Sequence, residues 1–255
     1  MEKNILITGA SSGFGLATAR KFAKNGWNII FCGRREQRIR ELEEELKSMS
    51  NIKFLGLVLD VRNRNDVEST IASLPRAFST LDVLINNAGL AAGLDLFDEA
   101  ELDDWEQMID TNIKGLLYMS RACLPLLKQS NAPHIINIGS TAAKNIYERG
   151  NVYCASKAAV DALSQSMRID LLKHQIKVTA IHPGAAETEF STVRFKGDSN
   201  KASAVYKGFT PLNAEDIADI IYYCATLPKH VCINDLVVTP TMQANAHYIH
   251  KKIVD

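Results

Sequence analysis

The sequence has no long apolar run and no excess of charge of either sign. No segment approaches the roughly 18 unbroken apolar residues that a membrane-spanning helix needs. The N-terminal apolar run stops after a few residues at Thr8 and Gly9, which is too short for a secretory signal. Basic and acidic residues each number 29, so the formal net charge is zero and nothing suggests a nucleic-acid partner. We therefore expect a cytoplasmic protein that binds neither membranes nor nucleic acid.

Cysteine is also scarce, and its spacing argues against a fold held together by disulfides. The five cysteines are scattered and odd in number, and they form no Cys-x-x-Cys pair. The six histidines show no metal-ligand spacing, so we expect no metal. His182 is the only histidine near candidate chemistry, and we expect a structural role for it. With 255 residues the chain can bury a large core in one domain without such staples.

Short apolar runs alternate with segments of helical period along the whole chain. The expected strands are 4–8, 28–32, 52–59, 82–86, 134–139, 176–182 and 233–240. The expected helical segments are 14–25, 36–49, 64–78, 103–129, 152–174 and 214–226. Strands that are apolar throughout and alternate with helices are typical of a parallel sheet covered on both faces. The sequence predicts an α/β fold: a doubly wound, Rossmann-like sheet of about seven strands.

One stretch, 184–212, shows no clear period. Nearly thirty irregular residues in a compact domain are typically either disordered or functional. Because this stretch follows the carboxyl end of an expected strand, where ligands bind in open α/β sheets, we favour a substrate lid.

A glycine-rich loop, TGASSGFG at 8–15, joins the first expected strand to the first helix. Its glycines allow a tight turn and a close backbone approach, and the helix start attracts a pyrophosphate. Three residues separate the first two glycines, which departs from the G-x-G-x-x-G fingerprint. The alternative is a turn that serves packing alone. The residues expected to contact a dinucleotide are Gly9, Ser11, Ser12, Gly13, Phe14 and Gly15.

Two arginines, Arg34 and Arg35, stand at the end of the second expected strand, where a dinucleotide site meets the adenosine ribose. An acidic residue there accepts bonds from a free 2'-hydroxyl, whereas an arginine binds a 2'-phosphate. Both could instead be solvated cations at a helix start, but arginine is electrostatically unfavourable in a first helical turn. The pair favours NADP over NAD.

Tyr153 and Lys157 are four residues apart in an expected helix, so their side chains lie on the same face. An ammonium beside a phenol lowers the pKa of the phenol, because it stabilises the phenolate. Bringing a tyrosine from its ordinary pKa to about 7 takes roughly 4 kcal/mol of differential stabilisation. A close lysine in a dry site can supply much of this, so the pair predicts a general acid/base. Read alone, the spacing also fits an ordinary amphipathic helix face.

Four motifs taken together, in their order and spacing, resemble the short-chain dehydrogenase/reductase family over essentially the whole chain. They are TGASSGFG at 8–15, NNAG at 86–89, Ser140 in INIGSTAA, and YCASK at 153–157 followed by Pro183-Gly184. The resemblance implies an oxidoreductase with Tyr153 as acid/base, and with Lys157 lowering its pKa and binding the nicotinamide ribose. It implies that Ser140 binds the carbonyl oxygen and that Asn112 holds a water linked to Lys157. The implied cofactor contacts are Asp60, Val61, Asn87, Pro183, Gly184 and Thr188, besides Tyr153, Lys157 and the glycine loop.

The run 189–198, with the segments 108–127 and 134–142, resembles the NADP-dependent 3-hydroxy acid dehydrogenases. That subfamily acts on short anionic substrates, so Arg194 becomes the candidate carboxylate ligand, or else a loop-ordering ion pair. Tyr147 and Arg149 replace a small, glycine-rich turn and are expected near the mouth of the site, on the substrate side of Ser140. A second cation there suits a sulfonate, so a sulfoacetaldehyde reductase is the alternative, with the 3-hydroxy acid reading favoured.

A hypothesis of another class is a catalytically silent, NADP-sensing protein, which the presence of Asn112, Ser140, Tyr153 and Lys157 disfavours. The resemblance also implies a homotetramer that uses the helices near 103–129 and 152–174. The C-terminal tail, MQANAHYIHKKIVD, could cross to a neighbouring subunit or fold over its own site, and the sequence does not decide between the two.

Overall fold

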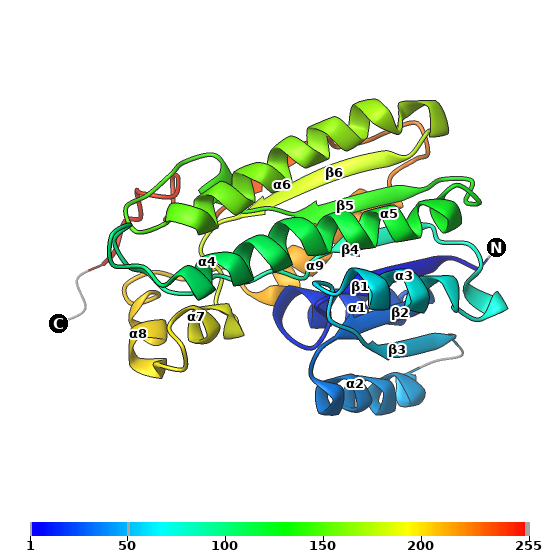
Figure 1. Ribbon diagram of the computed structural model, residues 1–255, viewed down its shortest axis with the longest axis horizontal. Helices are drawn as coiled ribbons and strands as arrows, with labels where there is room; N and C mark the ends of the chain where they lie inside the picture. The colour runs from blue at the N-terminus through cyan, green and yellow to red at the C-terminus, as the bar shows by residue number, and fades with distance from the viewer. Residues whose placement is uncertain (1, 50–51, 253–255) are drawn as a thin grey trace.

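A computed structural model describes residues 2–49 and 52–252 of the chain. Its centre is one sheet of seven parallel strands in the order β3-β2-β1-β4-β5-β6-β7 (Figure 1). The strands are β1 (Asn4–Thr8), β2 (Asn28–Gly33), β3 (Phe54–Val58), β4 (Val83–Asn86), β5 (His134–Ile138), β6 (Lys177–Pro183) and β7 (Asp235–Val238). All seven expected strands are confirmed, with ends that differ by at most a few residues.

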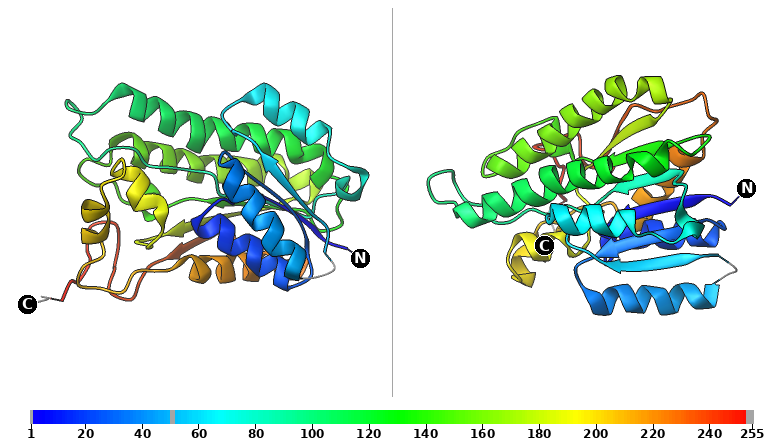
Figure 2. Two further views of the ribbon diagram at one scale, coloured as in Figure 1. Left: turned by 90° about the horizontal axis from the view of Figure 1, so that it is seen from below. Right: turned by 45° about the vertical axis from the view of Figure 1, so that its right-hand side comes forward.

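Helices cover both faces of the sheet, as expected (Figure 2). The longer helices are α1 (Gly13–Lys24), α2 (Glu36–Met49), α3 (Arg64–Ala72), α4 (Leu102–Ile109), α5 (Leu116–Leu127), α6 (Asn151–Asp170) and α9 (Ala214–Thr226). The expected segment 64–78 ends at Ala72, because Pro75 stops it before a short 3-10 turn at Arg76–Phe78. The expected segment 103–129 is divided by a π-helical turn at Asp110–Gly115.

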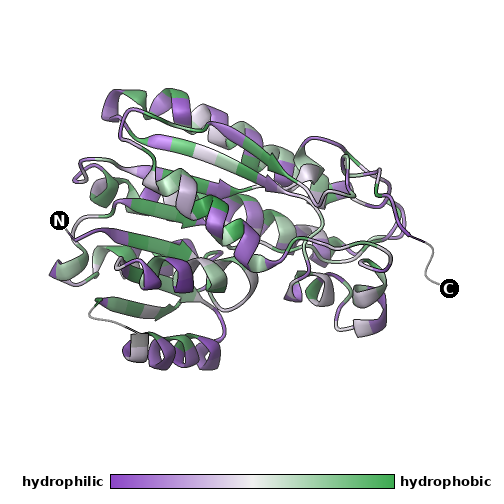
Figure 3. Cartoon of the chain, turned by 180° about the vertical axis from the view of Figure 1, so that it is seen from behind, coloured by the Kyte–Doolittle hydropathy of each residue, from purple (hydrophilic) through white to green (hydrophobic). Residues whose placement is uncertain are grey.

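The apolar core consists of two layers, one on each side of the sheet. Ile5 and Ile7 of β1 pack on the side of α1, α2 and α9, whereas Leu6 packs on the side of α3 and α5. This alternation follows from the two-residue period of a strand, and both layers are apolar because the strands are buried on both faces (Figure 3). No helix of the described residues is long and apolar enough to span a membrane.

The strand order reverses at β1, which lies between β2 and β4. Chain segments that leave neighbouring strands in opposite directions open a crevice at the carboxyl ends, where ligands bind in such sheets. The segment 184–212 lies beyond this edge (Figure 1). It contains two helices, α7 (Glu189–Arg194) and α8 (Ser199–Ala204), where the sequence showed no period. Each is six residues long, which is too short for a periodic pattern, and each starts at a capping side chain, Thr188 or Asp198.

Candidate active site

A single cavity of about 620 Å³ follows the carboxyl edge of the sheet. Loops after β1, β2, β4, β5 and β6 line it, together with α7 and the C-terminal tail. The predicted site residues in its wall are Gly9, Ser11, Ser12, Gly13, Phe14, Arg34, Arg35, Asp60, Val61, Asn87, Ser140, Tyr147, Tyr153, Lys157, Pro183, Gly184, Thr188 and Arg194. The fold thus brings together residues that are as much as 185 positions apart, Gly9 and Arg194.

The glycine loop is held against the loop after β4. Gly9 has a φ of 66°, and a Cβ there would lie 2.9 Å from the Cα of Ala88, so only glycine fits. The side chain of Asn87 donates to the carbonyl of Thr8 at 2.8 Å and so locks the two loops together. Gly15 is buried behind the loop and does not line the cavity, because a Cβ there would lie 2.4 Å from the Gly9 carbonyl oxygen. Gly15 thus packs closely against the glycine loop, and its predicted contact with the cofactor stays a prediction.

The N-terminus of α1 opens on this part of the cavity. Ser12 precedes the helix without a side-chain cap from the described residues, and the first turn carries no acidic residue. The first backbone N–H groups, at Gly13 and Phe14 in the cavity wall, are therefore available to an anion. This geometry fits the pyrophosphate of a dinucleotide.

The two arginines after β2 have different surroundings. Arg35 donates to the carboxylate of Glu189 at 2.8 Å and to the Ser11 carbonyl at 3.1 Å, so it connects the glycine loop to the start of α7. Arg35 also holds the pKa of Glu189 below its usual value. Arg34 is exposed at the cavity wall and forms no ion pair with any described residue. Arg34 is therefore the better placed of the two to receive a phosphate.

Asp60 and Val61 lie in the cavity wall beyond β3. Burial raises the pKa of Asp60, but its hydrogen bonds with Arg62 outweigh this and lower it overall, so Asp60 is an anion. Both carboxylate oxygens of Asp60 accept hydrogen bonds from that guanidinium. Asp60 and Arg62 therefore hold each other in place at this part of the cavity wall.

Ser140, Tyr153 and Lys157 meet at the other end of the cavity. Ser140 follows β5, and its hydroxyl oxygen accepts from the backbone N–H of Ala142 at 3.1 Å. Tyr153 and Lys157 lie one turn apart near the start of α6, and only 8% and 6% of their surfaces are exposed. The ammonium of Lys157 donates to the Ile138 carbonyl at 2.9 Å and lies 6.0 Å from the centre of the Tyr153 ring.

The pKa of Tyr153 is raised in this structure, and the predicted effect of Lys157 on it stays a prediction. Burial raises the pKa of Tyr153, and its contacts with Ser140 and the positive charge of Arg194 oppose that rise. Burial also lowers the pKa of Lys157 to about 8. The ammonium of Lys157 points to the Ile138 carbonyl instead of the phenol.

Asn112 occupies the π-helical turn and does not line the cavity. Its side-chain oxygen accepts from the Leu90 N–H at 2.8 Å, and its side-chain nitrogen donates to the Leu90 carbonyl and to the Ser156 hydroxyl. This amide therefore fixes the loop after β4 against α6. A water held by Asn112 would have to use its backbone carbonyl.

Arg194, at the end of α7, lies at the end of the cavity that holds Ser140, Tyr153 and Lys157; we call this the catalytic end. Its guanidinium carbon lies 5.6 Å from the Tyr153 ring centre and 5.5 Å from that of Tyr147. Its Nε and Nη2 atoms are buried and have no hydrogen-bond partner among the described residues. The Gly93 N–H donates to the Arg194 carbonyl at 3.1 Å and so fixes this end of α7. Arg194 is thus not held by an ion pair within the lid.

The turn before α6 differs from the expectation in one respect. Tyr147 lines the cavity as expected, but Arg149 does not, because it sits exposed in the turn with a φ of 62°. Glu148 lines the cavity instead.

Several residues of the cavity wall were not predicted from the sequence. Phe190 of α7 packs on Tyr153 with ring centres 5.7 Å apart, and the tail contributes Gln243, Ala246 and Ile249. Gln243 accepts from the Ala185 N–H at 2.7 Å, so this part of the tail lies against the site of its own chain. Phe190 stood in the run that carried the resemblance, whereas the tail has no pattern that indicates a contact.

Comparisons with known proteins agree with this geometry. Residues 3–198 match the family described as short chain dehydrogenase. The NADP-dependent 3-hydroxy acid dehydrogenase YdfG of Salmonella typhi is 49% identical over 95% of this chain and 96% of its own. Sulfoacetaldehyde reductase 2 of Chromohalobacter salexigens is 48% identical over 96% of each chain. The closed form of a serine dehydrogenase complexed with NADP+ is 45% identical, with a TM-score of 0.90, over 98% of this chain and all of that one. The chain therefore belongs to the short chain dehydrogenase family.

Proposed function

We propose that this protein is an NADP-dependent oxidoreductase that interconverts a short 3-hydroxy acid and its semialdehyde or ketone. The observation that carries the proposal is the half-buried Arg194. Its buried Nε and Nη2 atoms have no hydrogen-bond partner among the described residues, and its guanidinium carbon lies 5.6 Å from the Tyr153 ring centre. A cation in that position needs an anion, and a carboxylate two or three bonds from the reacting carbon places its oxygens there. The similarity to YdfG and to a serine dehydrogenase supports the same assignment.

The residues at the other end fit NADP. The open N-terminus of α1 suits the pyrophosphate, and Arg34 is available to the 2'-phosphate. Gly9 and Gly13, with φ of 66° and 52°, let the backbone approach a ligand closely, and a Cβ at Gly13 would point at Thr188. When bound, this cofactor supplies or accepts the hydride.

Side chains of the protein then transfer the proton and bind the carbonyl oxygen of the substrate. We assign Tyr153 as the acid that protonates the carbonyl oxygen in reduction and as the base in oxidation. Ser140 donates to the same oxygen and so orients it and stabilises the charge that develops there. Lys157, with a pKa of about 8, can exchange a proton at neutral pH, and its burial beside Tyr153 makes it the group that resupplies the phenol.

The alternative is a sulfoacetaldehyde reductase that uses the same site. The similarity to sulfoacetaldehyde reductase 2 favours it, because that relative is as similar as YdfG. A sulfonate has three acceptor oxygens and suits two cations, but Arg149 lies outside the cavity wall. Arg194 alone matches the two oxygens of a carboxylate better. A catalytically silent protein is disfavoured because Ser140, Tyr153 and Lys157 meet in one cavity.

Steady-state kinetics tests the proposal. We expect NADPH-dependent reduction of malonic semialdehyde with a higher kcat/KM than that of sulfoacetaldehyde, and both above neutral propanal. A higher kcat/KM for sulfoacetaldehyde than for malonic semialdehyde would favour the sulfoacetaldehyde reductase instead. Turnover of propanal equal to that of both anions would refute the anionic substrate class.

A second prediction concerns the cofactor. Arg34→Ala should lower kcat/KM for NADPH by roughly 10- to 100-fold and leave that for NADH nearly unchanged, because a charge-assisted hydrogen bond contributes about 1.5–3 kcal/mol. Arg35→Ala is the matched comparison, and we expect a smaller loss because Arg35 is already engaged by Glu189. An equal loss of kcat/KM with NADPH and with NADH would show that Arg34 does not bind the 2'-phosphate.

The homotetramer and the cytoplasmic location stay predictions. The helices named for the interface carry the exposed apolar residues Leu117 and Ile169, which is compatible with a contact between subunits.

A further inference from the structure

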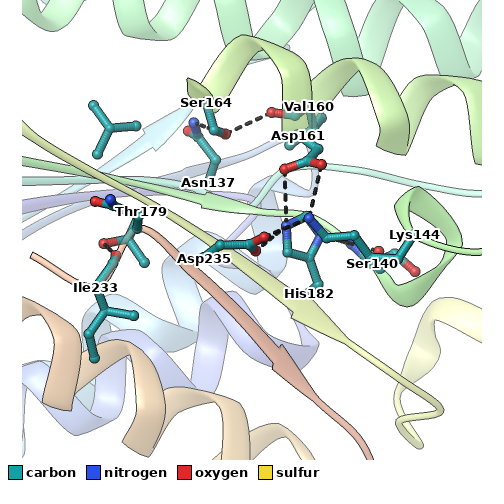
Figure 4. A network of polar contacts seen from close by, with 12 residues as sticks. Asn137, Ser140, Lys144, Val160, Asp161, Ser164, Thr179, His182, Ile233 and Asp235 are labelled. Carbon is teal, nitrogen blue, oxygen red and sulfur yellow. Dashed lines mark hydrogen bonds and ion pairs between the residues drawn. The ribbon is translucent and has the colours of Figure 1, made fainter. Parts of the chain in front are cut away.

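A buried histidine lies directly behind Ser140. His182, near the end of β6, is fully buried, and its Nδ1 lies 3.3 Å from the backbone nitrogen of Ser140 and 3.2 Å from its carbonyl oxygen. On the other side of the ring, Nε2 lies 2.9 Å from Oδ1 of Asp235 and 3.5 Å from Oδ1 of Asp161 (Figure 4). The imidazole thus connects two carboxylates to the peptide of Ser140.

The carboxylates decide which ring nitrogen carries the proton. Burial, and then the charge of Lys144, lower the pKa of His182, while Asp235 and Asp161 oppose this, so the ring is neutral at neutral pH. A neutral ring with its lone pair on Nε2 would direct that lone pair at two carboxylates, which is unfavourable. The proton therefore resides on Nε2, which lies 2.9 Å from Oδ1 of Asp235 and contacts it electrostatically, without the alignment of a hydrogen bond. Nδ1 is then an acceptor, and it can only accept from the Ser140 N–H.

Lys144 forms ion pairs with both carboxylates. Its ammonium lies 2.9 Å from Oδ2 of Asp161 and 2.6 Å from Oδ2 of Asp235. Asp161, His182 and Asp235 together offer ligand atoms close enough to hold a metal ion. Because Lys144 already supplies the positive charge between the two carboxylates, we assign no metal to this cluster.

Two further features tie the cluster to the catalytic end. Asp161 lies one turn after Lys157, which lies one turn after Tyr153, so one face of α6 presents all three. Gly139 precedes Ser140, and a Cβ on it would lie 2.3 Å from Nδ1 of His182. Only glycine at this position lets the imidazole approach the Ser140 peptide.

We propose that His182 is a positioning residue that fixes the Ser140 peptide, with its tautomer set by Asp235 and Asp161. The Ser140 N–H binds to His182, and the Ser140 hydroxyl oxygen accepts from the Ala142 N–H, so both ends of the residue are fixed before a substrate enters. The inference rests on the proposed function, in which the Ser140 hydroxyl orients the carbonyl oxygen.

A pair of substitutions tests this role. His182→Phe keeps the ring but leaves the buried Ser140 N–H without an acceptor, whereas His182→Asn places an amide oxygen near the position of Nδ1. We expect His182→Phe to lower kcat by about tenfold or more with the dissociation constant of NADPH changed less than about twofold. His182→Asn should recover most of the lost kcat, although it leaves a larger void. If kcat per folded molecule is the same in both variants, or if His182→Phe is fully active, the proposal is wrong.

A measurement that needs no substrate separates this inference from the proposed function. In protein labelled with ¹⁵N-histidine, NMR at pH 7 should show His182 as the neutral tautomer with its proton on Nε2. A proton on Nδ1, or an imidazolium, would overturn the inference whatever the activity or the stability of the variants. A wild-type protein that reduces none of the aldehydes would instead contradict the proposed function, and the NMR result would still decide the tautomer.

Discussion

Replacing Tyr153 with phenylalanine should lower kcat for carbonyl reduction by roughly 10²- to 10⁴-fold, the range that a positioned general acid contributes. The phenol of Tyr153 lies at the same end of the cavity as Ser140 and Lys157. Burial disfavours the phenolate, which keeps Tyr153 protonated and ready to donate in the reductive direction. The loss should therefore appear in kcat measured with saturating NADPH and aldehyde.

The matched measurements for Tyr153→Phe are NADPH affinity and thermal unfolding. The ring of Tyr153 packs on Phe190 and next to Cys154 in a small apolar cluster, and phenylalanine preserves that packing. We expect the dissociation constant of NADPH and the Tm to stay close to those of the wild type. A variant that retains more than a tenth of the wild-type kcat would refute the assignment of Tyr153 as the acid/base.

The sheet could be predicted in full because its strands are buried on both faces. A strand that is buried on both faces needs apolar side chains at successive positions, and a short apolar run such as NILIT fits this pattern. The lid could be located but not described, because α7 and α8 are each stabilised by a capping side chain and by tertiary contacts rather than by a periodic face. The π-helical turn at Asp110–Gly115 leaves no mark in the sequence, since it differs from an α-helix only in which carbonyl each N–H reaches.

In the candidate site, the spacing of residues in the sequence does not predict which way a side chain points. Tyr153 and Lys157 do lie on one helical face, but the direction of the ammonium is set by the Ile138 carbonyl on β5, which sequence spacing does not reveal. Arg194 and Arg149 were both predicted as substrate-binding cations, with the 3-hydroxy acid interpretation that uses Arg194 favoured. The left-handed backbone at Arg149 leaves its side chain outside the cavity wall, whereas the Gly93 N–H fixes the end of α7 so that Arg194 enters it. Both outcomes depend on loop geometry.

The second large effect is expected at Arg194. Arg194→Met keeps much of the length and the packing on Tyr147 and Tyr153 but removes the charge. Removing one partner of a buried charge pair costs about 2–5 kcal/mol, so kcat/KM for malonic semialdehyde should fall by roughly 30-fold or more. Propanal has no anion, and its kcat/KM should change little. The measured quantity is the ratio of the two kcat/KM values, which cancels any general effect on Tyr153.

Arg149→Met is the matched control, because it removes the same charge in the turn that leads into α6, outside the cavity wall. This variant should leave the ratio of kcat/KM for malonic semialdehyde to kcat/KM for propanal unchanged. If Arg149→Met lowers turnover of sulfoacetaldehyde alone, the second cation reaches the substrate and the sulfonate reading becomes the better one. If Arg194→Met lowers the kcat/KM of propanal as much as that of the anion, Arg194 acts on Tyr153 and not on the substrate. Only a selective loss with the anion makes Arg194 the residue that determines the substrate class.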